Sequence, residues 1–166
     1  MRVARSTHLA VAFIALIVLG GCVSDEPTRR PPPAQPEQIA PSAVQIFLSL
    51  PEDTNANSYV DTVMVTVYLF ADGYAPSVFV QGEFQFRLLN KDGTEVAQWT
   101  ITREASQASV RRLPPGPGYM IQLNLLDRGT DQIPSNPLDL YCSFTPTGGK
   151  TVHARPHTLR YGRIGT

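Results

Sequence analysis

The segment at residues 53–61, DTNANSYVD, carries oxygen-bearing side chains at a spacing that suits a hard cation. Asp53, Asn55, Asn57 and Asp61 occupy loop positions 1, 3, 5 and 9, and the carbonyl of Tyr59 falls at position 7. A tight loop points every second side chain inward, so such a loop can gather the oxygens that Ca²⁺ requires. The pattern therefore gives five candidate ligands for a calcium ion.

This spacing resembles the D-x-D-x-D-G-x-x-D calcium loops of dockerin-like and EF-hand-like segments. The loop departs from them in having Ser58 at the glycine position and Met64 in place of a bidentate glutamate. With only two formal negative charges, it is expected to bind calcium in the weak, extracellular range if it binds the ion at all. The favoured alternative is a metal-free polar connection in which Asn and Asp side chains accept hydrogen bonds from their own backbone.

Motifs for catalysis are absent from the sequence, which has no G-x-S-x-G, H-E-x-x-H, phosphate-binding glycine loop or C-x-x-C. Cys142 lies in an apolar, alternating stretch without an activating partner, which predicts a buried structural thiol. His153 and His157 are four apart, but Pro156 argues against the helix that would place both on one metal. We therefore predict exposed histidines, no cofactor and no enzymatic activity. An envelope hydrolase with dispersed catalytic residues is the less favoured alternative.

Tyrosines near predicted loops are a further candidate site. Tyr59, Tyr74 and Tyr161 could act as stacking platforms for a sugar, although aromatic residues half-packed at the bases of loops are the favoured interpretation. Four other aromatic residues follow strand alternation and are predicted to be core residues: Phe84, Phe86, Trp99 and Tyr119.

Short apolar segments separated by turn signals predict an all-β domain. Strands are expected at residues 44–50, 63–70, 78–89, 95–101, 110–113, 119–126, 138–144 and 151–161. A hairpin turn is expected at NKDG (90–93), a helical turn at 102–109 and a break at PPGPG (114–118). Seven or eight such strands are typical of a two-sheet sandwich of immunoglobulin-like or related topology.

Length and charge narrow the class further. The 166 residues suit one domain, and the 15 prolines and 12 glycines are too many for a helical bundle. Setting aside Arg2 and Arg5 leaves 12 Lys and Arg against 14 Asp and Glu. This balance gives no basic surface for nucleic acid, which is therefore not an expected partner.

The N-terminus has the three-part build of a secretory signal. Two arginines precede an apolar run at residues 9–19, which is shorter than the roughly 20 residues that span a bilayer. The run ends in Leu19-Gly20-Gly21-Cys22, which resembles the lipobox of bacterial lipoproteins. That resemblance implies removal of residues 1–21 and lipidation of Cys22. The alternatives are an ordinary secretory signal or an uncleaved anchor.

A proline-rich tether is predicted to follow the lipidated cysteine. Residues 23–43 contain six prolines and few large apolar side chains, so we expect an extended spacer at 22–43 that reaches roughly 60 Å. The ordered domain is predicted at residues 44–166. Two or three acyl chains, such as palmitate, would hold the protein on a membrane. Val23, where Asp would favour inner-membrane retention, points to the outer membrane.

Together these features predict a lipid-anchored protein of the cell envelope. Its β-sandwich is expected to be a non-catalytic binding or structural accessory module with an envelope protein or glycan as partner. The alternative is a glycan- or peptide-binding module with a weak calcium site at Asp53, Asn55, Asn57, Tyr59 and Asp61.

Overall fold

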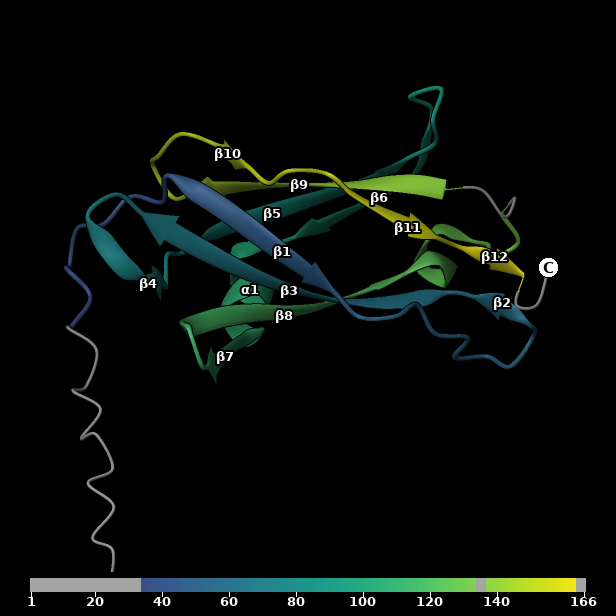
Figure 1. Ribbon diagram of the computed structural model, residues 1–166, viewed down its shortest axis with the longest axis horizontal. Coiled ribbons are helices and arrows are strands. Elements are labelled where there is room, and N and C mark those ends of the chain that lie inside the picture. The colour runs from purple at the N-terminus through teal and green to yellow at the C-terminus, as the bar shows by residue number, and fades with distance from the viewer. Residues whose placement is uncertain (1–33, 134–136, 164–166) are drawn as a thin grey trace, which may run out of the picture. The chain divides into compact units, whose positions relative to one another are not determined.

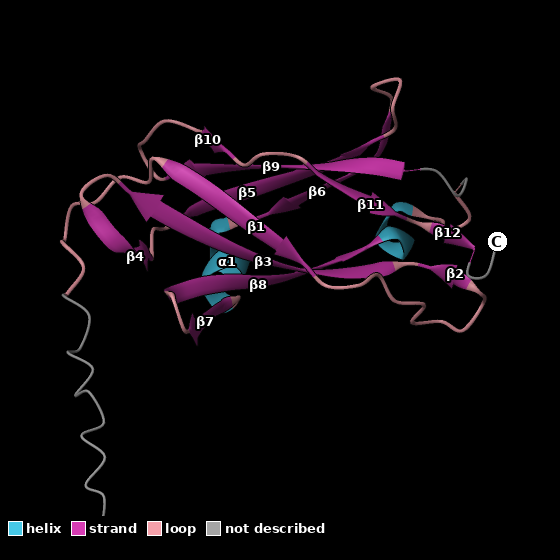
Figure 2. Ribbon diagram, viewed as in Figure 1, coloured by secondary structure: helices cyan, strands magenta, loops and turns pink. Residues whose placement is uncertain are grey.

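Alternating apolar and polar residues build two antiparallel sheets that pack face to face (Figures 1 and 2). The computed structural model describes residues 34–133 and 137–163. The expected signal peptide and Cys22 lie outside the described residues. Among the residues that the structure does describe, no helix is long and apolar enough to cross a membrane. The all-β sandwich expected from the sequence is confirmed.

The first sheet has the strand order β1-β3-β8-β7, and β4 pairs with the end of β3. Its strands are β1 (Ala43–Leu48), β3 (Thr62–Ala71), β4 (Tyr74–Val78), β7 (Val110–Leu113) and β8 (Gly116–Asn124). β3 lies in the middle, as its apolar sequence predicts, with β1 on one side and β8 on the other.

The second sheet has the order β10-β9-β5-β6, with β11 pairing along β9 after β10. Its strands are β5 (Gly82–Leu89), β6 (Glu95–Ile101), β9 (Pro137–Pro146), β10 (Val152–His153) and β11 (His157–Arg160). The two orders correspond to the ABED and GFC sheets of an immunoglobulin-like sandwich, with β6 as an added edge strand. A small separate ladder joins β2 (Tyr59–Val60) to β12 (Gly162–Arg163).

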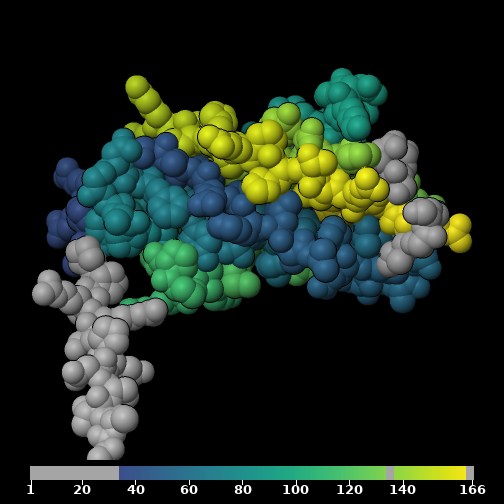
Figure 3. All heavy atoms as spheres, in the orientation of Figure 1, coloured from purple at the N-terminus to yellow at the C-terminus, as the bar shows by residue number. Residues whose placement is uncertain are grey.

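The two sheets approach each other along one edge. Val44 of β1 forms a parallel bridge with Ala154, which follows β10. Figure 3 shows the same relationship on the surface, where the yellow C-terminal segment runs alongside the blue β1. The first and last parts of the sandwich are thereby tied together, which limits fraying of β1.

The core lies between the sheets and is rich in aromatic rings. Phe84 is central: its ring centroid lies 4.9 Å from that of Tyr119 and 4.6 Å from that of Phe144. Phe86 is also fully buried, and Trp99 is buried with its Nε1 donating to the carbonyl of Asn124 at 3.0 Å. The four aromatic residues predicted to be core residues are therefore confirmed, because strand alternation turns them all to the same interior.

The helical turn expected at residues 102–109 is present as α1 (Arg103–Ala108). Thr102 caps it by accepting a hydrogen bond from the backbone N–H of Ala105, and the buried Ser106 hydroxyl donates to the carbonyl of Gly82 at 2.7 Å. A short 3₁₀ helix, η1 (Leu125–Arg128), follows β8 and ends at Gly129, whose φ is 99°. This helix replaces the end of the strand predicted at 119–126.

Two other strand predictions and the predicted break at PPGPG need correction. The strand expected at 78–89 is shorter, since Val78 ends β4 and β5 begins at Gly82; in the connection between them the Tyr119 hydroxyl hydrogen-bonds both the N–H and the carbonyl of Val80. The strand at 151–161 is divided around Pro156, which cannot donate to a ladder. The PPGPG segment does not end the sheet: β8 already begins at Gly116, whose φ of 128° suits glycine.

The folded unit begins at Ala34, whereas the sequence predicts a start near residue 44. Gln35 explains the difference, because its side-chain amide donates to the carbonyl of Phe79 and accepts from the N–H of the same residue. The Ser42 hydroxyl then donates to Asp72 at 2.8 Å. Polar side chains thus fasten a segment that has too few apolar residues to signal order in the sequence.

Candidate functional site

The loop between β1 and β3 is organised by two carboxylates that accept hydrogen bonds from different segments. Asp61 is fully buried, and its carboxylate accepts from the backbone N–H groups of Thr54 (2.9 Å) and Asn55 (3.3 Å). The hydroxyls of Thr54 and Thr62 also donate to it. Burial by itself raises the pKa of Asp61, but these hydrogen bonds outweigh burial and lower the pKa below its ordinary value of 3.8.

Asp53 caps the other half of the loop. Its two oxygens accept from the backbone N–H groups of Asn57 (3.2 Å) and Ser58 (2.8 Å). The turn between them passes through positive φ at Ala56 (59°) and Ser58 (71°), a region that residues with a Cβ occupy rarely. The side-chain oxygen of Asn57 accepts from the N–H of Tyr59 at 2.8 Å. The loop therefore uses its side-chain oxygens to hold its own backbone.

Asp131 belongs to this cluster, and sequence reasoning missed it. Its Oδ2 accepts from the side-chain amides of Asn55 (2.9 Å) and Asn57 (2.8 Å), and the residue is 3% exposed. It lies more than 70 residues away along the chain. No spacing rule within one loop could have joined it to residues 53–61.

Hydrogen-bond donors of the protein occupy the side-chain oxygens of the loop. In the described part of the chain, no group of three or more His, Cys, Asp or Glu residues is placed to hold a metal ion. Asp53 and Asp61 accept from different backbone segments, and the amide nitrogens of both asparagines face Asp131. Calcium binding at Asp53, Asn55, Asn57, Tyr59 and Asp61 stays a prediction, and these contacts give it no added support.

Cys142 is buried and the two histidines are exposed, as the sequence predicts. Cys142 is buried on the inner face of β9, and burial raises its pKa to about 12. Burial and the raised pKa both disfavour the thiolate, which is the nucleophilic form of cysteine. His153 and His157 are exposed on separate strands, β10 and β11, opposite Ser143 and Leu140 of β9.

The tyrosines near loops do not form a platform. Tyr161 is 2% exposed and packs in the core, so it is neither a stacking platform nor a ring half-packed at the base of a loop. Burial, and then the charge of Asp61, raise the pKa of its hydroxyl, which has no hydrogen-bond partner among the described residues. Tyr59 and Tyr74 are half-buried, as expected for rings at the bases of loops.

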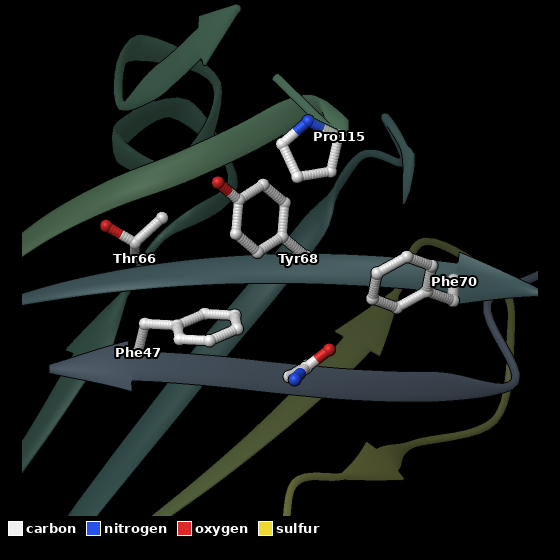
Figure 4. Close-up of a pocket in the computed structure, with 6 residues that line it drawn as sticks. Phe47, Thr66, Tyr68, Phe70 and Pro115 are labelled. Carbon is white, nitrogen blue, oxygen red and sulfur yellow. The ribbon is translucent and has the colours of Figure 1, made fainter. Parts of the chain in front are cut away.

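A different aromatic cluster lies on the outer face of the β1-β3-β8-β7 sheet (Figure 4). It forms a hollow of about 270 Å³, which we call the aromatic hollow. Its lining is Gln45 and Phe47 of β1, Thr66, Tyr68 and Phe70 of β3, and Pro115 of the β7–β8 turn. The ring of Phe47 is half exposed and stands at 81° to that of Tyr68, with centroids 5.8 Å apart. The Phe47 ring forms a side wall of the hollow, and the Tyr68 ring forms its floor.

Gly118 of β8 leaves the space that the Tyr68 ring occupies. A Cβ at Gly118 would lie 2.8 Å from Cε1 of Tyr68 and 2.8 Å from Cδ1 of Leu113. The Tyr68 ring can therefore lie against β8 only because residue 118 has no side chain. The PPGPG segment, predicted to be a break, thus contributes both Pro115 and Gly118 to the hollow.

The polar groups of the hollow are free for a ligand. Within the described residues, the side chains of Gln45 and Thr66 and the hydroxyl of Tyr68 form no hydrogen bond. An amide and two hydroxyls therefore stand beside three aromatic rings without internal partners. Binding sites for small molecules combine these two features, apolar walls and a few convergent polar groups.

Sequence reasoning missed the hollow because the second strand, predicted at residues 63–70, is apolar at nearly every position and so does not show which residues face outward. The register shows alternation instead: Gln45 lies opposite Tyr68, and Phe47 lies opposite Thr66, on the face that points away from the core. The burial pattern of β1, in which Val44 and Ile46 are buried and Gln45 and Phe47 are exposed, was visible as alternation in the sequence. An aromatic residue on the polar side of that alternation was the available signal.

No family model matches the chain, and no curated protein matches it. A solved structure with some similarity is the β-glucuronidase of Bifidobacterium dentium in complex with coumarin-3-O-glucuronide. It is 12% identical with a TM-score of 0.31, covering 74% of this chain and 18% of that enzyme. The chain therefore spans less than a fifth of the length of that protein.

Proposed function

We propose that this chain is a lipid-anchored protein of the cell envelope whose β-sandwich is a non-catalytic binding module. The aromatic hollow carries the binding part of the proposal, because it combines aromatic rings, of which Phe47 is half exposed, with unpartnered polar groups on one sheet face. The lipobox at residues 19–22 and the proline-rich segment behind it support the anchor. Val23 supports the outer membrane as its location.

A non-catalytic role is supported by the burial of the cysteine thiol and by the hydrogen bonds that the buried and loop carboxylates accept. The Cys142 thiol is buried with a pKa of about 12, and the carboxylates of Asp53, Asp61 and Asp131 are engaged by donors of the protein. The hollow itself has no acid, base or nucleophile in its lining apart from the hydroxyls of Thr66 and Tyr68. Such a lining can hold a ligand, and it contains no carboxylate, imidazole, amine or thiol of the kind that usually acts as a general acid or base.

The anchor is tested by labelling growing cells with radioactive palmitate. The chain is expected to take up label, and Cys22→Ser is expected to abolish it. An unlabelled protein, or a labelled Cys22→Ser variant, would rule out lipidation at this residue.

The binding module is tested by photo-crosslinking in cells, with benzoylphenylalanine placed at one surface position at a time. Met120 is the reporter position, because it is 38% exposed and pairs with Thr66 of the hollow. Gln85 is the matched control, because it is exposed on the outer face of the other sheet. We expect an adduct of altered mobility from position 120 and not from position 85. Equal adduct formation, or none at position 120, would contradict a binding role for this face.

A further inference from the structure

We infer that the ligand of the aromatic hollow is a neutral glycan, recognised by one or two of its sugar rings. This inference rests on the proposed function and names the ligand class for the same site. Three observations carry it: the absence of charged residues from the lining of the hollow, the unpartnered polar groups, and the size of the hollow.

The residues that line the hollow carry no charge. The three strands beneath and beside it read AVQIFL, TVMVTVYLFA and GPGYMIQLN, and none contains Asp, Glu, Lys or Arg. The edge strand β7 carries Arg111 and Arg112, and the guanidinium of Arg111 donates to the backbone carbonyls of Ala108 and Val110. The opposite sheet has charged residues on β5, β6, β9 and β11: Glu83, Arg87, Glu95, Asp139 and Arg160. An ionic ligand would find no counter-charge in the hollow and would lose hydration there, so an uncharged ligand fits it best.

The polar lining argues against a purely apolar occupant. If an apolar protein surface covered the hollow, the Gln45 amide and the hydroxyls of Thr66 and Tyr68 would be buried without partners, at a cost of about 1–3 kcal/mol each. A sugar ring has apolar C–H faces and a rim of hydroxyls. Its face can lie on the rings of Phe47 and Phe70 while its rim pairs with these groups.

The size of the hollow also fits a small unit. A volume of about 270 Å³ lies near the lower end of the range for small-molecule sites. A stable protein interface buries roughly 800 Å² and about 20–30 residues on each partner, whereas six residues line the hollow. The wall and floor made by Phe47 and Tyr68 instead suit a compact ring that contacts two planes at once.

The test is a binding measurement with the full chain, purified in detergent, on an array of neutral oligomers of glucose, mannose, galactose and N-acetylglucosamine. Uronic-acid and sulfated oligomers provide charged counterparts. We expect retention by at least one neutral oligomer and by no charged one. Phe47→Ala is expected to weaken that binding about tenfold or more, as truncation of an aromatic anchor does. Tyr141→Ala is the matched control, since Tyr141 is 40% exposed on the other outer face.

Binding by the Tyr68→Phe variant distinguishes a glycan ligand from an apolar one. The variant keeps the ring and removes only the hydroxyl, so glycan binding is expected to fall several-fold because a sugar hydroxyl loses its partner.

No retention on any neutral oligomer, a preference for charged oligomers, or equal losses in Phe47→Ala and Tyr141→Ala would overturn the inference. So would a dimer in sedimentation that Phe47→Ala dissociates, because the face would then bind a second copy. Crosslinking from Met120 with no glycan retained would overturn the ligand class and leave the binding module standing.

Discussion

The hydroxyl of Tyr119 holds the backbone of Val80 at both of its polar groups. It donates to the carbonyl at 2.6 Å and accepts from the N–H at 3.0 Å. Tyr119 is fully buried on β8, and Val80 lies in the connection between β4 and β5. One side chain of the first sheet therefore fixes the point at which the chain crosses to the second.

Tyr119→Phe is expected to destabilise the fold by about 1–3 kcal/mol, because it leaves both polar groups of Val80 without their partner while keeping the ring. Urea denaturation measures this change. Tyr141→Phe is the control, because Tyr141 is exposed and forms none of these hydrogen bonds. An unchanged free energy of unfolding for Tyr119→Phe would show that the crossing is held by other contacts.

Alkaline stability should depend on the same residue. Burial raises the pKa of Tyr119 to about 12, and the hydrogen bond to Val80 only partly opposes this. Because the folded pKa lies above the unfolded value near 10, the contribution is complete below pH 10 and is lost as the pH rises toward 12. The free energy of unfolding is expected to fall over this range, and less steeply in Tyr119→Phe. Parallel curves for the two proteins would contradict this assignment.

Acid stability is expected to depend on Asp61. Its folded pKa is lower than the ordinary 3.8, so its contribution is present above that pH and is lost as the pH falls through the folded pKa. Asp61→Asn should cost about 1–3 kcal/mol at neutral pH and should flatten the acid limb of the stability curve. Asp92→Asn, in an exposed turn, is the control. Denaturation at a series of pH values between 2 and 7 measures both effects.

The thiol of Cys142 should react only when the protein unfolds. The full chain with Cys22→Ser retains Cys142 as its single cysteine. Burial and the raised pKa predict very slow labelling by a thiol-specific reagent at pH 8, and fast labelling in denaturant. Labelling of the native protein as fast as that of the denatured protein would show that β9 is open to solvent.

Gly118→Ala should disturb the aromatic hollow from below. The new Cβ would lie 2.8 Å from the Tyr68 ring and from Leu113, so we expect a loss of about 1–3 kcal/mol from overpacking. The double variant Gly118→Ala with Tyr68→Ala should recover part of that loss, because it removes one of the two clashes. Additive losses in the double-mutant cycle would mean that the Tyr68 ring does not lie against residue 118.

The sequence was a good guide to the interior and a poor guide to the outer surface. Alternation in β5 and β6 was sufficient to predict the core positions of Phe84, Phe86 and Trp99, because burial of one face imposes a period of two. The hairpin at residues 90–93 was equally predictable, with Gly93 at a φ of 79°. Both features depend only on residues close together in the sequence, so they can be predicted without knowing how distant segments pack.

The features that were missed depend on residues distant in the chain. Asp131 reaches Asn55 and Asn57 only through the fold, and the aromatic hollow needs β1, β3 and the β7–β8 turn to be side by side. The strand VMVTVYLF is apolar on both faces, so its sequence does not reveal that Tyr68 and Phe70 face outward. Only the register with β1 makes that distinction.

The most direct test of the central claim is the yield of crosslinks from position 120 in cells, compared between the native hollow and the Phe47→Ala variant. Phe47 is half exposed and does not belong to the core, so the variant is expected to fold normally. If the aromatic hollow is the binding surface, the yield from position 120 should fall about tenfold. A yield that is the same in both proteins would contradict the claim that this hollow binds the ligand.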